Sequence, residues 1–196
     1  MTASDPKDDL HRYLRAGREA LLWKLDGLGD YDIRRPLVPT GTNLLGLIKH
    51  LAWVEWGYFA LAFNRPMPDT PAWFTDEDDE PNADMWASAD ESREQIVTLY
   101  RQVTAHADDT IATLDLDATG QVLWWSADRR EASLHRLLVH TIAETHRHAG
   151  HADIVRELID GAVGMRQGSG NLPDTEPTWW SGYRDRLQAV AEQFRP

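Results

Sequence analysis

The stretch from Ser133 to Asp160 constrains the fold more than any other part of the chain. Its apolar residues recur at intervals of three and four positions, which predicts one long α-helix with one buried face, followed by Gly161 at its C-terminal end. Within this helix the segment ETHRHAGHADIVRELIDG, which begins at Glu144, carries three histidines among acidic and basic residues. Because the core face of a helix is normally apolar, we expect some of these groups to have a chemical role.

Four further segments also have the periodicity of helices. Asp5 and Pro6 suit the N-cap and the first turn of one helix, and Thr42 suits the N-cap of a second, nearly all-apolar helix. Ser88 and Glu91 have the spacing of a capping box at the start of a third. Together with the long stretch above, the expected helices cover residues 5–28, 42–63, 88–114, 133–160 and 178–194.

Segments rich in proline, glycine and charge separate these helices. Residues 29–40 break the helical period, residues 64–87 predict an ordered crossover loop, and residues 115–132 suggest a short hairpin or loop. Long connections on both sides of the third helix predict an all-α four-helix bundle that is not simply up-down-up-down. With a short C-terminal helix added, we expect residues 1–196 to form a single domain.

Composition excludes several classes of function. The chain has no cysteine, which excludes disulfides, cysteine-ligated metals and a cysteine nucleophile, and leaves any metal site to His, Asp and Glu. The net charge is -12, with an acidic run in TDEDDEPNAD, so we expect neither nucleic acid nor a membrane surface as a partner. The sequence shows no signal peptide and no long apolar run, which predicts a cytoplasmic protein. Some of the nine tryptophans are expected to line a pocket or a subunit contact.

Two residues of the long helix point to a metal site. Glu144 and His148 lie on the stripe of the helix that also carries the core leucines, and their Cβ atoms are expected about 6 Å apart. Burying a carboxylate beside an imidazole is costly unless each has a partner, and a divalent cation is one such partner. His50, alone among apolar residues of the second helix, supplies a third ligand. Three protein ligands leave coordination positions open, as in catalytic sites.

Alternatives to this ligand set remain open at the level of sequence. His50 could be an ordinary core histidine, and Glu144 with His148 could be a plain ion pair. His140 stands four residues before Glu144 and is the main rival ligand, whereas His151 suits a supporting or substrate-facing role. His146 points away from the stripe and is expected to be solvated.

The other charges near the end of the long helix are expected to lie on its surface. Asp153 and Glu157 are predicted to pair with Arg156 or Arg147, with support of a ligand histidine as the lesser alternative. The same two arginines, or Arg166, could hold a carboxylate or sugar of a substrate.

With these residues identified, the chain resembles the DinB-like metal-binding four-helix-bundle superfamily, in the branch related to the metal-binding domain of mycothiol-dependent maleylpyruvate isomerase. The resemblance rests on GTNLLGLIKHLAWVEWGYF, DMWASADESREQIVTLY and HTIAETHRHAGHADIVRELIDG. It implies that His50, Glu144 and His148 bind a divalent metal, zinc or else nickel, in an up-up-down-down bundle. It also implies mycothiol or a similar thiol as co-substrate and a homodimer. The chain after Gly161 is too short for the additional domain of that isomerase, so we do not expect isomerase activity.

Two classes of function fit these features. The first is a divalent-metal-dependent transferase that joins a low-molecular-weight thiol to a small electrophile in detoxification or stress, with a metal-dependent hydrolase as its nearest variant. The second is a non-catalytic metal-binding dimer that acts in the stress response, which predicts a closed coordination shell. An ion-pair core without metal is the simplest alternative.

Overall fold

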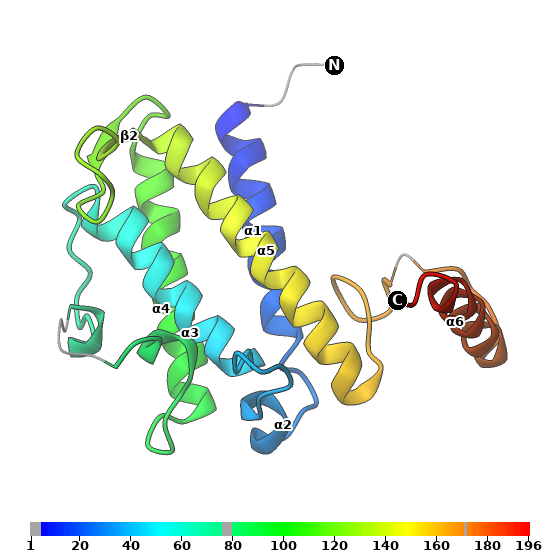
Figure 1. Ribbon diagram of the computed structural model, residues 1–196. Coiled ribbons are helices and arrows are strands. Elements are labelled where there is room, and N and C mark those ends of the chain that lie inside the picture. Colours follow the sequence, from blue (N-terminus) through cyan, green and yellow to red (C-terminus); the bar gives the residue numbers. More distant parts are fainter. Residues whose placement is uncertain (1–4, 76–79, 171) are drawn as a thin grey trace.

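Four long helices make up the main body of the protein and pack beside one another (Figure 1). The structure is a computed structural model that describes residues 5–75, 80–170 and 172–196. The long helices are α1 (Pro6–Trp23), α3 (Leu44–Trp56), α4 (Arg93–Thr113) and α5 (Leu134–Asp160). The other helical elements are α2 (Asp30–Arg34), the π-helical turn η1 (Gly57–Leu61), the 3-10 turns η2 (Ala72–Phe74) and η3 (Ala83–Met85), and the C-terminal α6 (Pro177–Glu192). The predicted all-α class is confirmed.

The helix directions differ from the expected up-up-down-down order. Lys7 at the start of α1 donates to the carbonyl of Leu114 after the end of α4 (2.9 Å), and Arg93 at the start of α4 donates to the carbonyl of Leu28 (2.8 Å). Helices α1 and α4 are therefore antiparallel. Arg156 near the end of α5 donates to the carbonyl of Lys24 just after α1 (2.9 Å), so α1 and α5 run in the same direction. The order is up-down-down-up, in which α3 and α4 share the opposite direction.

The connection between α4 and α5 explains this order. Instead of crossing the length of the bundle, it folds into a hairpin in which β1 (Thr119–Gln121) pairs antiparallel with β2 (Glu131–Ser133). The backbone N–H of Gln121 donates to the carbonyl of Ala62 (2.7 Å), which holds the hairpin against the end of η1. The chain thus turns back at one end of the helices, and only the connection from α3 to α4 is a long crossover. Part of that crossover, residues 76–79 of the acidic run, lies outside the described residues.

Helices α3 and α4 begin slightly later than predicted. Asn43, rather than Thr42, is the N-cap of α3, and its side chain accepts a hydrogen bond from the N–H of Gly46 (2.8 Å). The capping box of α4 is formed by Ser92 and Gln95, whereas the predicted Ser88 precedes the helix in the connecting loop. Asn is a stronger N-cap than Thr, which favours Asn43 over Thr42. Ser88 and Ser92 are the same residue type, so cap preference alone does not distinguish them. The predicted end of α5 is confirmed, since Gly161 has a φ of 77°.

A glycine on α3 lets a distant loop approach the helix. The loop that contains η3 packs on the first turn of α3, where Asn43 donates to the carbonyl of Met85 (3.2 Å). A Cβ at Gly46 would overlap that same carbonyl oxygen. Only glycine therefore permits this contact, which places η3 one turn before His50 along α3.

We expect Gly46→Ala to destabilise the protein by about 1 to 3 kcal/mol, because the backbone of Met85 must move to relieve the overlap. Gly150→Ala on α5 is the matched control, since a Cβ there meets no atom within 4 Å. It should instead stabilise the helix by about 0.5 to 1 kcal/mol. Urea unfolding of the metal-free variants measures both changes, and equal effects at the two positions would contradict the role assigned to Gly46.

The core surrounds α3, as its all-round apolar sequence predicts. All but two of its residues, His50 and Trp53, are buried. The core also contains a buried ion pair, in which Arg18 of α1 contacts Glu55 of α3. At the other end of the chain, α6 leaves large apolar side chains exposed, among them Leu187 and Val190. No helix in the described part of the chain is long and apolar enough to cross a membrane.

Candidate metal centre

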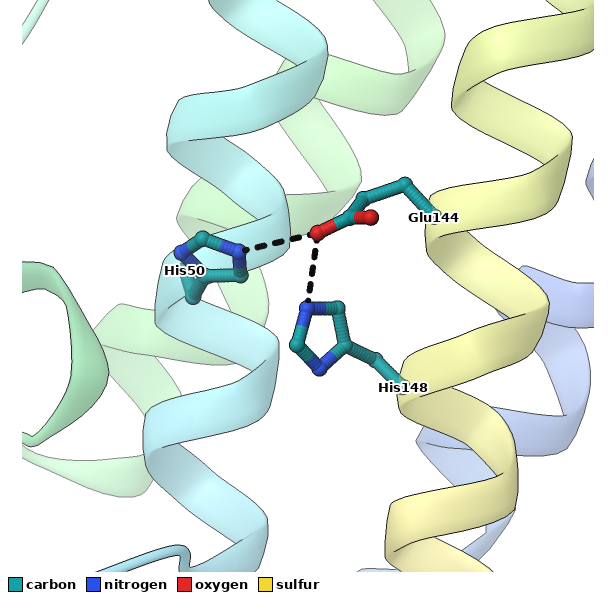
Figure 2. Close-up of side chains that lie close together, drawn as sticks. All are labelled: His50, Glu144 and His148. Atoms are coloured by element: carbon teal, nitrogen blue, oxygen red, sulfur yellow. Dashed lines mark hydrogen bonds and ion pairs between the residues drawn. The ribbon is translucent and has the colours of Figure 1, made fainter. Parts of the chain in front are cut away.

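His50, Glu144 and His148 meet between α3 and α5 (Figure 2). The Oε1 atom of Glu144 lies 3.0 Å from Nε2 of His148 and 3.8 Å from Nε2 of His50. One ligand atom from each residue lies within 4.8 Å of the others. Glu144 and His148 come from successive turns of α5 and His50 from the middle of α3, so the antiparallel packing of these two helices creates the cluster.

Hydrogen bonds outside the cluster orient the two imidazoles. Nδ1 of His50 lies 2.5 Å from Oδ2 of Asp84, and Nδ1 of His148 lies 3.3 Å from Nδ1 of His151. Each ring therefore directs its Nε2 atom toward Glu144. A carboxylate behind a histidine fixes the tautomer that exposes the other nitrogen, which is the usual support of a metal-binding histidine.

The protonation states also suit a cation. Partial burial lowers the pKa of His148, and the neighbouring His50 lowers it further, which favours the neutral imidazole, the form that binds a metal, at neutral pH. Partial burial would raise the pKa of Glu144, but the interaction with His148 outweighs it, and the net pKa is lowered. The hydrogen bond with His50 lowers the pKa of Asp84. Both carboxyl groups are therefore ionised.

This donor set fits a divalent metal. Two imidazole nitrogens and one carboxylate oxygen are a common ligand combination for zinc. Bonds of about 2.0 to 2.1 Å in a tetrahedral arrangement separate neighbouring ligand atoms by about 3.3 Å. The two distances from Glu144, 3.0 and 3.8 Å, lie on either side of that value. Because the three ligand atoms all lie within 4.8 Å of one another, side-chain movements of about 1 to 1.5 Å would bring them to a shared ion.

Asp84 is the supporting residue that sequence reasoning missed. It lies in η3, within the irregular crossover between α3 and α4, and comes from the acidic run that indicated only charge. No periodicity marks a residue in such a segment. The contact depends on the close packing of η3 at Gly46, which appears only in the tertiary structure.

We expect Asp84→Asn to weaken metal binding by about 10- to 100-fold, because the amide cannot hold His50 in the same charge-assisted hydrogen bond. Asp90→Asn removes the same charge from an exposed position of the same crossover and should leave the affinity unchanged. Competition of each variant with a chromophoric chelator measures the difference. Equal affinities of the two variants would show that Asp84 does not support the site.

Two other histidines of α5 are not part of the cluster. Nε2 of His140 lies 2.9 Å from the hydroxyl of Tyr58, and the ring packs against Trp125. The rival ligand set that included His140 is therefore not assembled. Nε2 of His146 lies 3.0 Å from the carbonyl oxygen of Tyr13 on α1. His146 points away from the site as predicted, but it is half-buried against α1 rather than solvated.

The expected partners of the acidic residues on α5 are corrected by the structure. Asp153 pairs with the buried Lys24 of α1 (2.6 Å) and not with an arginine. Arg156 is itself buried and donates to Asp160 and to the carbonyls of Lys24 and Asp26. These contacts occupy its guanidinium, which is therefore not available to hold a substrate.

Aromatic side chains gather along α3 in the turns after His50. Trp53, one turn after His50, lies near Trp124 of the hairpin loop, with ring centroids 6.4 Å apart. Trp124 also contacts Tyr58, at 5.3 Å. A pocket of about 850 Å³ lies between α5 and α6, and its lining includes Asp153, Glu157 and Trp180. It contains none of the three clustered residues.

Comparison with known proteins finds a family model that matches most of the chain. The model of a family described as Mycothiol-S-transferase matches residues 9–161. The match includes all three clustered residues and ends just after α5, so α6 lies outside it. No curated protein is similar enough to the chain to be counted as a relative.

Proposed function

The chain belongs to the mycothiol S-transferase family, a metal-dependent branch of the DinB-like superfamily, and from this premise we propose that it joins mycothiol to a small electrophile at a metal bound by His50, Glu144 and His148. The observation that carries the proposal is the convergence of these three side chains from two helices. Three protein ligands leave a coordination position of the metal open for a substrate thiol.

The residues of the chain prepare the site for a thiol. The Nδ1 atoms of His50 and His148 contact Asp84 and His151, which leaves both Nε2 atoms facing the site. Glu144 adds a negative charge between them. A divalent metal bound there supplies the positive charge that lowers the pKa of a neighbouring thiol toward neutral pH. The indoles of Trp53 and Trp124 add an apolar surface near His50. Because the chain has no cysteine, the nucleophilic sulfur belongs to the co-substrate.

We expect purified, zinc-loaded protein to conjugate mycothiol to 1-chloro-2,4-dinitrobenzene well above the uncatalysed rate, and chelation to remove this activity. Absorbance of the aryl thioether follows the reaction. The absence of conjugation across several electrophiles, by a protein that does bind metal, would contradict the proposal. It would favour the non-catalytic metal-binding protein instead.

We propose zinc as the metal, since imidazole and carboxylate ligands with an open position suit it best. Elemental analysis of untagged protein should give about one zinc per chain, as three ligands from one chain form one site. If the protein instead contained about one nickel per chain, nickel and not zinc would be the metal of the site. Because the thiol must be reduced to react, we place the reaction in the cytoplasm.

We also propose that residues 1–196 form one domain and that the protein is a homodimer. Support for one domain comes from Lys24, whose Nζ contacts both Asp153 and the carbonyl of Gly164 and so ties the loop after α5 to α1. Support for a dimer comes from exposed apolar residues on α5 and α6, namely Ile154, Leu158, Leu187 and Val190. Sedimentation equilibrium should give twice the mass of the chain, and a monomer at high protein concentration would contradict the dimer.

A further inference from the structure

A second pocket lies one helical turn from the metal centre. It has a volume of about 430 Å³ and is lined by Trp125, Arg129, Arg136, Val139, His140 and Ala143. His140 precedes Glu144 by four residues, which is about 6 Å along α5. This spacing places the pocket within the length of a small ligand from Glu144 along α5.

The charge of this pocket is opposite to that of the whole chain. The protein has a net charge of -12, yet the six lining residues include two arginines and no carboxylate. Asp128 of the same loop is not part of the lining, and its interactions with Ser126 and, more weakly, with Arg129 lower its pKa. Such a pocket attracts an anion from a surface that otherwise repels it.

The two arginines are available for a ligand. The guanidinium of Arg136 lies over the ring of Trp125, 4.9 Å from its centroid, which holds it in place. It makes no hydrogen bond or ion pair with any residue in the described part of the chain. Arg129 donates from Nε to the hydroxyl of Ser126 (3.1 Å), which leaves its terminal nitrogens for a ligand. Guanidinium groups suit planar carboxylates, and Trp125 with Val139 provides an apolar surface for the remainder of the molecule.

We propose that this pocket binds the carboxylate of the electrophile, so that the preferred electrophiles are apolar carboxylic acids. The inference rests on the proposed function and adds the substrate class. Mycothiol carries no carboxylate, because the carboxyl of its cysteine is in an amide bond, so the anion belongs to the other substrate. With 4-chloro-3,5-dinitrobenzoate, the thiol sulfur bonds to the ring carbon, the carbon–chlorine bond breaks, chloride leaves, and the thiol proton passes to the buffer.

Direct binding tests the pocket without turnover. Calorimetry compares 3,5-dinitrobenzoate with 3,5-dinitrobenzamide, neither of which has a leaving group. We expect the benzoate to bind about 10-fold more tightly to the unmodified protein, and Arg136→Gln or Arg129→Gln to remove most of this preference without weakening the benzamide. Arg15→Gln, which removes the same charge from an exposed position of α1, should change neither affinity. Equal binding of the two compounds by the unmodified protein, or equal weakening of both by Arg136→Gln, would overturn the proposal.

Kinetic measurements distinguish the proposed anion site from the proposed transferase activity. We expect a higher kcat/KM for 4-chloro-3,5-dinitrobenzoate than for its carboxamide, and Arg136→Gln should raise the KM of the carboxylate alone and leave the KM of mycothiol unchanged. If the benzoate preference appears in calorimetry but neither chloride reacts with mycothiol, the proposed function fails while the anion site stands. If both chlorides react but Arg136→Gln changes the KM of neither, the anion site fails while the transferase stands.

Discussion

Replacing His148 by alanine is expected to abolish both metal binding and thiol transfer. The variant leaves only His50 and Glu144, and two ligands from separate helices cannot hold a divalent metal at micromolar concentrations. We expect the affinity to fall by more than about 100-fold, which exceeds the loss typical of a residue that only supports a ligand. Metal content after dialysis and the rate of mycothiol conjugation measure the two effects.

His146→Gln is the matched control for this experiment. His146 lies on the same helix two residues away, but its Nε2 atom faces the carbonyl of Tyr13 on α1. The variant should keep its metal and its activity. If His148→Ala retained a full complement of metal, the cluster of His50, Glu144 and His148 would be a polar contact within the core and not a metal centre.

Arg18→Ala is expected to cause the largest loss of stability. Arg18 donates to both carboxylate oxygens of Glu55, at 2.9 and 2.5 Å, and to Asp108 at 2.6 Å. Burial alone would lower the pKa of Arg18, but these two acids raise it, so the arginine stays charged. The side chain of Glu55 is fully buried, and replacing Arg18 removes the cation that contacts both of its carboxylate oxygens. The expected cost is about 3 to 5 kcal/mol in the free energy of unfolding.

Denaturant unfolding of metal-free protein measures this cost and separates it from metal binding. Arg12→Ala removes an exposed arginine from the same helix and should change the unfolding midpoint little. The double variant Arg18→Leu with Glu55→Leu removes both charges and should be more stable than Arg18→Ala. A double variant less stable than Arg18→Ala would show that lost packing, not the unpaired charge, causes the effect.

Much of the fold could be predicted from periodicity. The long helix α5, its end at Gly161 and the buried character of α3 all follow from the spacing of apolar residues, because the direction of a side chain on a helix is fixed by its position. The directions of the helices could not be predicted in this way. They depend on whether residues 114–133 cross the bundle or fold back, and the contact of Gln121 with Ala62 that decides this is made between distant parts of the chain.

The metal centre, like the fold, could be predicted from the sequence only in part. Spacing and apolar context placed Glu144, His148 and His50 on inward faces, yet they left His140 as a rival ligand. The structure separates the two histidines, since His140 contacts Tyr58 and Trp125, whereas His148 reaches Glu144. Asp84 could not be found from the sequence, because irregular segments carry no period that fixes where a side chain points.

The sequence by itself therefore determined where the long helices form and which of their side chains face inward, since both are local properties of a helical chain; it did not predict α2 within residues 29–40. Only the tertiary structure decided which inward faces meet, which loop supports them, and where the arginines gather. These outcomes depend on contacts between residues far apart in the chain, such as the approach of η3 to Gly46 and the stacking of Arg136 on Trp125. No local pattern records such contacts, because they exist only once the helices have packed together.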